Sequence, residues 1–108
     1  MTLSTHVLDT ARGEPAAGVG VALYRRDGDA WAPVAWGQTD ADGRLRDWVL
    51  DSAWGAGRYR LVFDTGAYLG EDAFFPEAVI VFQVSAPARH LHVPLLLSPF
   101  GFTTYLGS

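Results

Sequence analysis

The chain contains no cysteine and no lysine. The absence of cysteine excludes disulfide scaffolds, thiolate nucleophiles, cysteine-ligated zinc and iron–sulfur clusters. Because lysine is absent, all 8 basic residues are arginines, and they are scattered along a chain whose net charge is -4. A scattered set of arginines on an acidic chain is a poor match for polyanions, so we expect neither nucleic acid nor an anionic membrane as a partner.

Long hydrophobic runs are missing as well. No apolar stretch approaches the roughly 18 residues that a membrane helix needs, and the segment from Met1 to His6 lacks the basic and apolar regions of a signal peptide. With 49% hydrophobic and 19% charged residues, the chain is nevertheless too apolar to be disordered. We expect a folded, soluble protein of the cytoplasm, unless a leader has been removed.

The length of 108 residues is typical of one domain, which we expect to span residues 1–108. A chain of this size buries about 60 to 65% of its unfolded surface on folding, which makes a real but modest core. Oligomerisation would therefore add useful burial.

Turn-forming residues recur at intervals of about ten residues, and short β-prone runs lie between them. This spacing favours an all-β fold, a two-sheet β-sandwich of about eight strands, or a small barrel. One helical turn is expected over residues 65–72, with Asp64 or Thr65 as its cap. The predicted strands lie near residues 3–9, 18–25, 30–37, 44–49, 58–64, 77–85, 89–97 and 100–106.

Two of the later predicted strands are apolar on both faces. Residues 78–82 read Ala-Val-Ile-Val-Phe, and in residues 92–97 the face opposite Val93 still carries Pro94 and Leu96. A two-layer sandwich covers only one face of each sheet. The uncovered apolar face therefore predicts a homo-oligomer formed through the C-terminal strands.

The three histidines and one arginine are the candidate reactive groups. His90 and His92 are two residues apart, so on a strand they would share a face, and His6 lies in the first predicted strand. Three imidazoles could hold a hydrolytic zinc ion, but no glutamate stands out as a hydrogen-bond partner for such ligands. Arg44 follows Asp42-Gly43, where a turn would direct it from the start of a strand. Each of these residues could equally be an ordinary structural or solvated side chain.

Other catalytic patterns are weaker. The serines, Ser4 among them, are not in a Gly-x-Ser-x-Gly turn, and the Gly18-Val19-Gly20 run is followed by a strand, which excludes a phosphate-binding loop. Asp40 and Asp42 lack the further ligands of a calcium loop and are typical turn residues. The four tryptophans are spread along the chain, which favours packing over a binding cleft.

Several longer motifs follow one another along the chain: residues 3–10 (LSTHVLDT), 13–16 (GEPA), 39–44 (TDADGR), 59–65 (YRLVFDT), 74–77 (FFPE) and 90–101 (HLHVPLLLSPFG). Together they resemble the 5-hydroxyisourate hydrolases, the transthyretin-like enzymes of urate degradation. Their order and spacing extend over nearly the whole chain. The resemblance implies a transthyretin-like sandwich, a homotetramer, and hydrolysis of 5-hydroxyisourate to 2-oxo-4-hydroxy-4-carboxy-5-ureidoimidazoline without a metal or cofactor.

The resemblance also implies the site residues. The family's catalytic residues fall on His6, Arg44 and His92, with His6 and Arg44 also binding substrate. Its C-terminal Tyr-Arg-Gly-Ser signature falls on residues 105–108, so that Tyr105 and Ser108 are expected to orient the substrate. Leu106 replaces the arginine of that signature. If side chains alternate to the end of the chain, Leu106 points away from the face that Tyr105 occupies.

These residues suit hydrolysis of a cyclic amide, which needs an activated water, a stabilised oxyanion and a proton for the leaving nitrogen. We expect His6 and His92 to handle the water and its proton, and Arg44 to bind a substrate carbonyl. A ligand-carrying protein on the same sandwich is the main alternative, and a structural sandwich module is a further one. The role of His90 is left open by the sequence.

Overall fold

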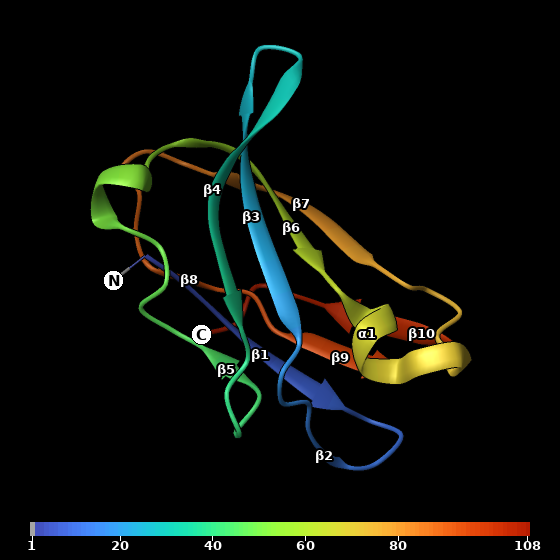
Figure 1. Ribbon diagram of the computed structural model, residues 1–108. Helices are drawn as coiled ribbons and strands as arrows, with labels where there is room; N and C mark the ends of the chain where they lie inside the picture. The colour runs from blue at the N-terminus through green and yellow to red at the C-terminus, as the bar shows by residue number, and fades with distance from the viewer. Residues whose placement is uncertain (1) are drawn as a thin grey trace.

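The computed structural model describes residues 2–108 as two β-sheets packed face to face (Figure 1). One sheet has the order β4 (Ala30–Gln38), β3 (Gly20–Asp27), β6 (Gly57–Phe63) and β7 (Ala78–Val84). The other has the order β10 (Gly101–Thr104), β9 (Leu95–Ser98), β1 (Leu3–Asp9) and β2 (Glu14–Pro15), with β5 (Arg44–Leu45) and β8 (Leu91–His92) also paired to β1. This arrangement confirms the predicted all-β sandwich.

The core lies between the two sheets and follows from the alternation of side chains along the strands. In β1 the odd-numbered residues Leu3, Thr5 and Val7 are buried against the other sheet, because successive side chains point to opposite faces. The even-numbered residues of β1 therefore face away from the core. The fully buried core side chains of the other strands include Val21, Leu23, Tyr59, Leu61, Phe63, Leu95 and Leu97.

Strand β1 is the centre of its sheet and has partners along both edges. On one edge it pairs parallel with β8 and then with β9. On the other it pairs antiparallel with β5 and β2. The outward face of β1 is thus bordered by residues from the middle and from the end of the chain.

The strand limits differ from the prediction where the backbone turns. The strand expected over 44–49 ends after Leu45, and Asp47 takes a positive φ of 55°. The strand expected over 89–97 is divided into β8 and β9 at residues 93–94, because Pro94 has no N–H for the ladder. The two-residue β2 and a 3₁₀ turn, η1 (Asp51–Ala53), are additional to the expected elements.

The predicted helical turn is present as α1 (Thr65–Leu69) followed by the 3₁₀ turn η2 (Gly70–Asp72). The carboxylate of Asp64 accepts a hydrogen bond from the backbone N–H of Ala67 and caps α1. Within residues 2–108 there is no helix long and apolar enough to span a membrane.

The outer apolar face predicted for the C-terminal half is only partly uncovered. Val79 and Val81 on β7 are exposed, as the sequence indicated. Pro94, however, is buried within the chain itself and Leu96 is half-buried. The apolar surface that remains open therefore lies on β7 rather than on the strand that carries the histidines.

Candidate active site

The register of β1 brings the predicted catalytic residues onto one face of the sheet. His6 is directly opposite Arg44 of β5, and Ser4 is directly opposite His92 of β8. His92 in turn forms a bridge with Gly107 near the C-terminus. Three chain segments that are far apart in the sequence thus supply one polar cluster.

Ser4, Arg44 and His92 of this cluster line a pocket of about 200 Å³, whereas His6 is not among its lining residues. Thr5 borders it as well, but most of its wall is the outward, polar side of the sheet. The site is therefore an open polar hollow rather than an apolar channel. Its lining residues are Ser4, Thr5, Arg44, Arg46, His90, His92 and Ser108.

His92 is held from both sides. Its Nδ1 lies 2.8 Å from Ser4 Oγ, and the chain at Gly107 is so close to the ring that a Cβ there would be 2.7 Å from His92 Cδ2. Burial is the largest cause that lowers the pKa of His92 below its usual value, and the nearby His6, Arg44 and His90 lower it further. The ring is consequently neutral at pH 7, as a proton acceptor or a neutral hydrogen-bond donor must be.

His6 is held by the turn that leads into β5. Its Nε2 lies 2.9 Å from the carbonyl oxygen of Asp42. The carboxylate of Asp40 accepts hydrogen bonds from the backbone N–H groups of Asp42 and Arg44, and the bond from Arg44 is the main cause that lowers the pKa of Asp40. The same turn therefore orients His6 and places Arg44 beside it.

Gly43 makes the turn possible. Its φ is +74°, a region that residues with a Cβ adopt at a cost, and a Cβ there would be 2.4 Å from the carbonyl oxygen of Val7. The backbone approaches β1 closely enough for the Val7 N–H to donate to the Gly43 carbonyl over 2.7 Å. The Asp-Gly sequence before Arg44 is thus a requirement of the site's geometry.

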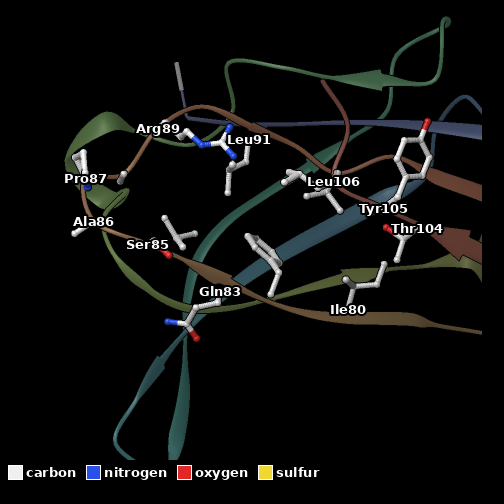
Figure 2. Close-up of a pocket in the computed structure, with 14 residues that line it drawn as sticks. Ile80, Gln83, Ser85, Ala86, Pro87, Arg89, Leu91, Thr104, Tyr105 and Leu106 are labelled. Carbon is white, nitrogen blue, oxygen red and sulfur yellow. The ribbon is translucent and has the colours of Figure 1, made fainter.

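The C-terminal signature is divided between two places. Ser108 lines the polar pocket, whereas Tyr105 and Leu106 line a larger, mostly apolar pocket of about 770 Å³ between β7 and the C-terminal segment. Figure 2 shows Leu106 and Tyr105 on one side of this pocket and Ile80 of β7 on the other. Strand alternation stops at Thr104, the end of β10. Strand alternation therefore does not fix the directions of Tyr105 and Leu106, and the expectation that they point to opposite faces stays a prediction.

Besides Thr5, three residues of the polar pocket are absent from the predicted site residues: Ser4, Arg46 and His90. Each lies two residues from a predicted one, namely His6, Arg44 and His92 respectively. The period of a strand would place each pair on the same face. The two-residue spacing is present in the sequence. The sequence alone does not show whether each strand extends far enough to hold both residues of a pair on one face.

The imidazoles do not converge as metal ligands would. Among residues 2–108, no group of three His, Cys, Asp or Glu side chains is placed so that it could hold a metal ion. His90 and His92 instead face the hydroxyl of Ser4. The rings of His90 and His92 are both hydrogen-bonded to the Ser4 hydroxyl. The side chains of Arg44 and Arg46 line the same pocket.

Sequence comparison assigns the chain to a family. Residues 3–107 match the model of the HIUase/Transthyretin family. A 5-hydroxyisourate hydrolase of Mesorhizobium japonicum is 49% identical over 113 residues, which cover 98% of this chain and 91% of that protein. One of Caulobacter vibrioides is 46% identical over 113 residues, which cover 98% of this chain and 97% of that protein.

Solved structures agree. Klebsiella pneumoniae 5-hydroxyisourate hydrolase has a TM-score of 0.84 and 40% identity, with 100% of both chains covered. Sea bream transthyretin in complex with thyroxine has a TM-score of 0.92 and 35% identity, with 99% of this chain and 95% of that chain covered. The resemblance noted in the sequence motifs is confirmed over nearly the full length, and the chain belongs to the HIUase/Transthyretin family.

Proposed function

We propose that this protein hydrolyses 5-hydroxyisourate to 2-oxo-4-hydroxy-4-carboxy-5-ureidoimidazoline in urate degradation, with no metal or cofactor. The observation that carries the proposal is the meeting of His6, Arg44 and His92, from three chain segments, on one polar face. Relatives named 5-hydroxyisourate hydrolase, at 49% and 46% identity over 98% of the chain, support the same activity.

The chemistry assigns a task to each group. The imidazoles are the groups that can hold the attacking water, accept its proton and return one to the ring nitrogen that leaves. The Arg44 guanidinium binds a substrate carbonyl and stabilises the negative charge that develops on its oxygen. The exposed hydroxyl of Ser108 orients the polar purine-derived ring by hydrogen bonding.

Arg46 adds a second cation to the same pocket. It is two residues beyond Arg44 and offers a guanidinium to a carboxylate or carbonyl of the substrate. In this chain Leu106 brings no cation from the C-terminal signature, so Arg46 and Arg44 are the guanidinium groups that line the polar pocket as the structure describes it.

Enzyme and carrier are distinguished by the polarity of the site. A carrier of apolar ligands has no use for two histidines and two arginines around about 200 Å³ of open, polar space. The sea bream relative with thyroxine bound shows that the sandwich itself does not decide the matter. The relatives named 5-hydroxyisourate hydrolase distinguish the enzyme from the carrier, and the chain is a hydrolase.

The homotetramer and the cytoplasmic location complete the proposal. The exposed apolar residues of β7 support association, since Val79 and Val81 are otherwise left in water. In an assembly, Tyr105 of one chain would orient substrate in the site of another, because it lines a different pocket from His92 in its own chain.

The first experiment generates 5-hydroxyisourate from urate with uricase and follows its ultraviolet decay, with a chelator present in a parallel assay. We expect faster decay with the protein than without it, and the same rate with chelator. Decay at the spontaneous rate would contradict the proposal, unless Leu106→Arg restores turnover and so identifies Leu106 as the cause. Loss of turnover with chelator would contradict its metal-free part.

A further inference from the structure

The hydroxyl of Ser4 joins two imidazole rings. Ser4 Oγ lies 2.8 Å from His92 Nδ1 and 3.1 Å from His90 Nε2, and the residue is only 7% exposed. A serine hydroxyl has one proton, so it donates to one ring and accepts from the other. The direction of this hydrogen-bond chain therefore determines which nitrogen of His92 carries a proton.

The environment of His90 Nδ1 determines the direction of the hydrogen bonds between His90, Ser4 and His92. Among residues 2–108, His90 Nδ1 is buried and has no hydrogen-bond partner. A proton on Nδ1 would be a buried donor without a partner, and among backbone groups orphaned buried N–H donors are rarer than under-satisfied acceptors. His90 therefore carries its proton on Nε2 and donates it to Ser4 Oγ. Ser4 then donates its own proton to His92 Nδ1, and the proton of neutral His92 is on Nε2.

The tautomer of His6 follows from its partner. The group that faces His6 Nε2 at 2.9 Å is the backbone carbonyl of Asp42. A carbonyl oxygen only accepts, so Nε2 of His6 carries the proton and Nδ1 is the bare nitrogen. The two rings thus carry different groups: the free nitrogen of His6 is a lone pair, and that of His92, which lines the polar pocket, is an N–H.

We infer that the two imidazoles are not equivalent, and that the hydrogen-bond chain His90–Ser4–His92 makes His92 a hydrogen-bond donor and leaves His6 as the base. This inference rests on the proposed function. Water gives a proton to His6 Nδ1 as its oxygen bonds to the amide carbon. His92 Nε2–H and Arg44 hold the oxyanion, and His92 keeps its proton. When the C–N bond breaks, the His6 imidazolium returns the proton to the leaving nitrogen.

The surroundings support this division. The Asp42 carbonyl that accepts from His6 also stabilises the imidazolium that forms there. Burial and the neighbouring His6, Arg44 and His90 all lower the pKa of His92, which keeps that ring neutral while the charge develops on His6. Ser4 and His90 are positioning residues, because they act on substrate only through His92.

Two-bond ¹H–¹⁵N correlation NMR tests the inference directly, since it shows for each histidine ring which nitrogen is protonated. In the wild-type protein we expect His92 with a bare Nδ1 and a protonated Nε2. Ser4→Ala should turn His92 into a mixture of tautomers, and Ser4→Thr should restore the single form. His90→Gln, which keeps a side-chain N–H donor, should leave His92 unchanged. A wild-type His92 protonated on Nδ1 would overturn the inference without any variant.

Kinetics supply the second test. Ser4→Ala should lower kcat by about tenfold or more with little change in KM, because the ring that meets the transition state is no longer fixed, and Ser4→Thr should recover most of it. A Ser4→Ala protein with unchanged kcat and unchanged tautomer would refute the positioning role.

The two proposals fail in different ways. Turnover by a wild-type protein whose His92 is protonated on Nδ1 would overturn this inference alone. If the wild-type protein fails to hydrolyse 5-hydroxyisourate and Leu106→Arg does not restore turnover, the proposed function and the catalytic roles of His6 and His92 are overturned together, whatever the NMR spectrum shows.

Discussion

At the scale of single residues, the site depends on neutral imidazoles beside permanent cations. Removing either kind of group removes an acid–base or oxyanion contribution, each of which is typically worth about a hundredfold or more in rate. We expect His92→Ala and Arg44→Ala each to lower turnover by at least about a hundredfold and to leave the oligomer intact. The assay is ultraviolet decay of 5-hydroxyisourate, with Arg58→Ala on the other sheet as control. Turnover near that of the wild type in either variant would remove that residue from the mechanism.

The pH dependence of His92 follows from the same surroundings. Its pKa in the folded protein is below 6.5, chiefly because of burial and then because of His6 and Arg44, whereas the unfolded chain titrates near the ordinary value. Between the two values the unfolded state binds more protons, so stability rises with pH through that window and is no longer limited by His92 above about 6.5. His92 should therefore stay neutral to a lower pH than an ordinary histidine does.

An NMR titration measures this directly. The His92 ring should titrate below 6.5 in the wild-type protein, and Arg44→Gln should raise its pKa because a neighbouring positive charge is lost. Arg58→Gln, on the outer face of the other sheet, should leave it unchanged. A His92 that titrates at or above the ordinary histidine value would show that burial and the nearby cations do not govern it.

At the scale of elements, the turn before β5 is what joins Arg44 to His6. Gly43→Ala places a Cβ against the Val7 carbonyl oxygen and requires a positive φ. We expect a loss of about 2 kcal/mol or more in the free energy of unfolding, from strain and clash together, and a loss of turnover because Arg44 moves. Denaturant unfolding and the decay assay measure the two effects.

Gly28 provides the matched control. Its φ is +60°, but a Cβ there would have nothing within 4 Å. Gly28→Ala should therefore cost only the backbone term, about 1 to 2 kcal/mol, and leave turnover unchanged. Equal losses of stability in the two variants, with Gly43→Ala fully active, would show that the close approach of this turn to β1 is unimportant.

At the scale of the whole molecule, the exposed apolar surface of β7 predicts association. Val81 is 53% exposed, and a carboxylate at this position would have to be desolvated in any interface that covers it. Val81→Glu should shift the mass measured by light scattering to smaller species while the circular dichroism spectrum stays that of the wild type, and turnover should fall with the mass. Gln38→Glu, an exposed residue at the end of β4 on the opposite edge of that sheet, is the control. An unchanged mass in Val81→Glu would place the interface elsewhere.

Local pattern determined much of this protein. Two-residue alternation and regularly spaced turns were enough to predict an all-β fold, a sandwich or a small barrel, and β1 has its predicted limits. The Asp-Gly pair predicted the turn that precedes Arg44, the first residue of β5. The family motifs marked His6, Arg44 and His92, which the structure brings to one face. These features could be predicted because neighbouring residues determine backbone conformation and side-chain direction.

Tertiary structure decided the rest, because it depends on pairings between distant segments. That Ser4 stands between His90 and His92 follows only from the parallel register of β1 and β8. That Tyr105 and Leu106 share an apolar pocket follows from the end of β10 at Thr104, after which alternation no longer applies. A sequence shows which side chains share a strand face, but strand register decides which face meets which neighbour, and that register is a property of the whole fold.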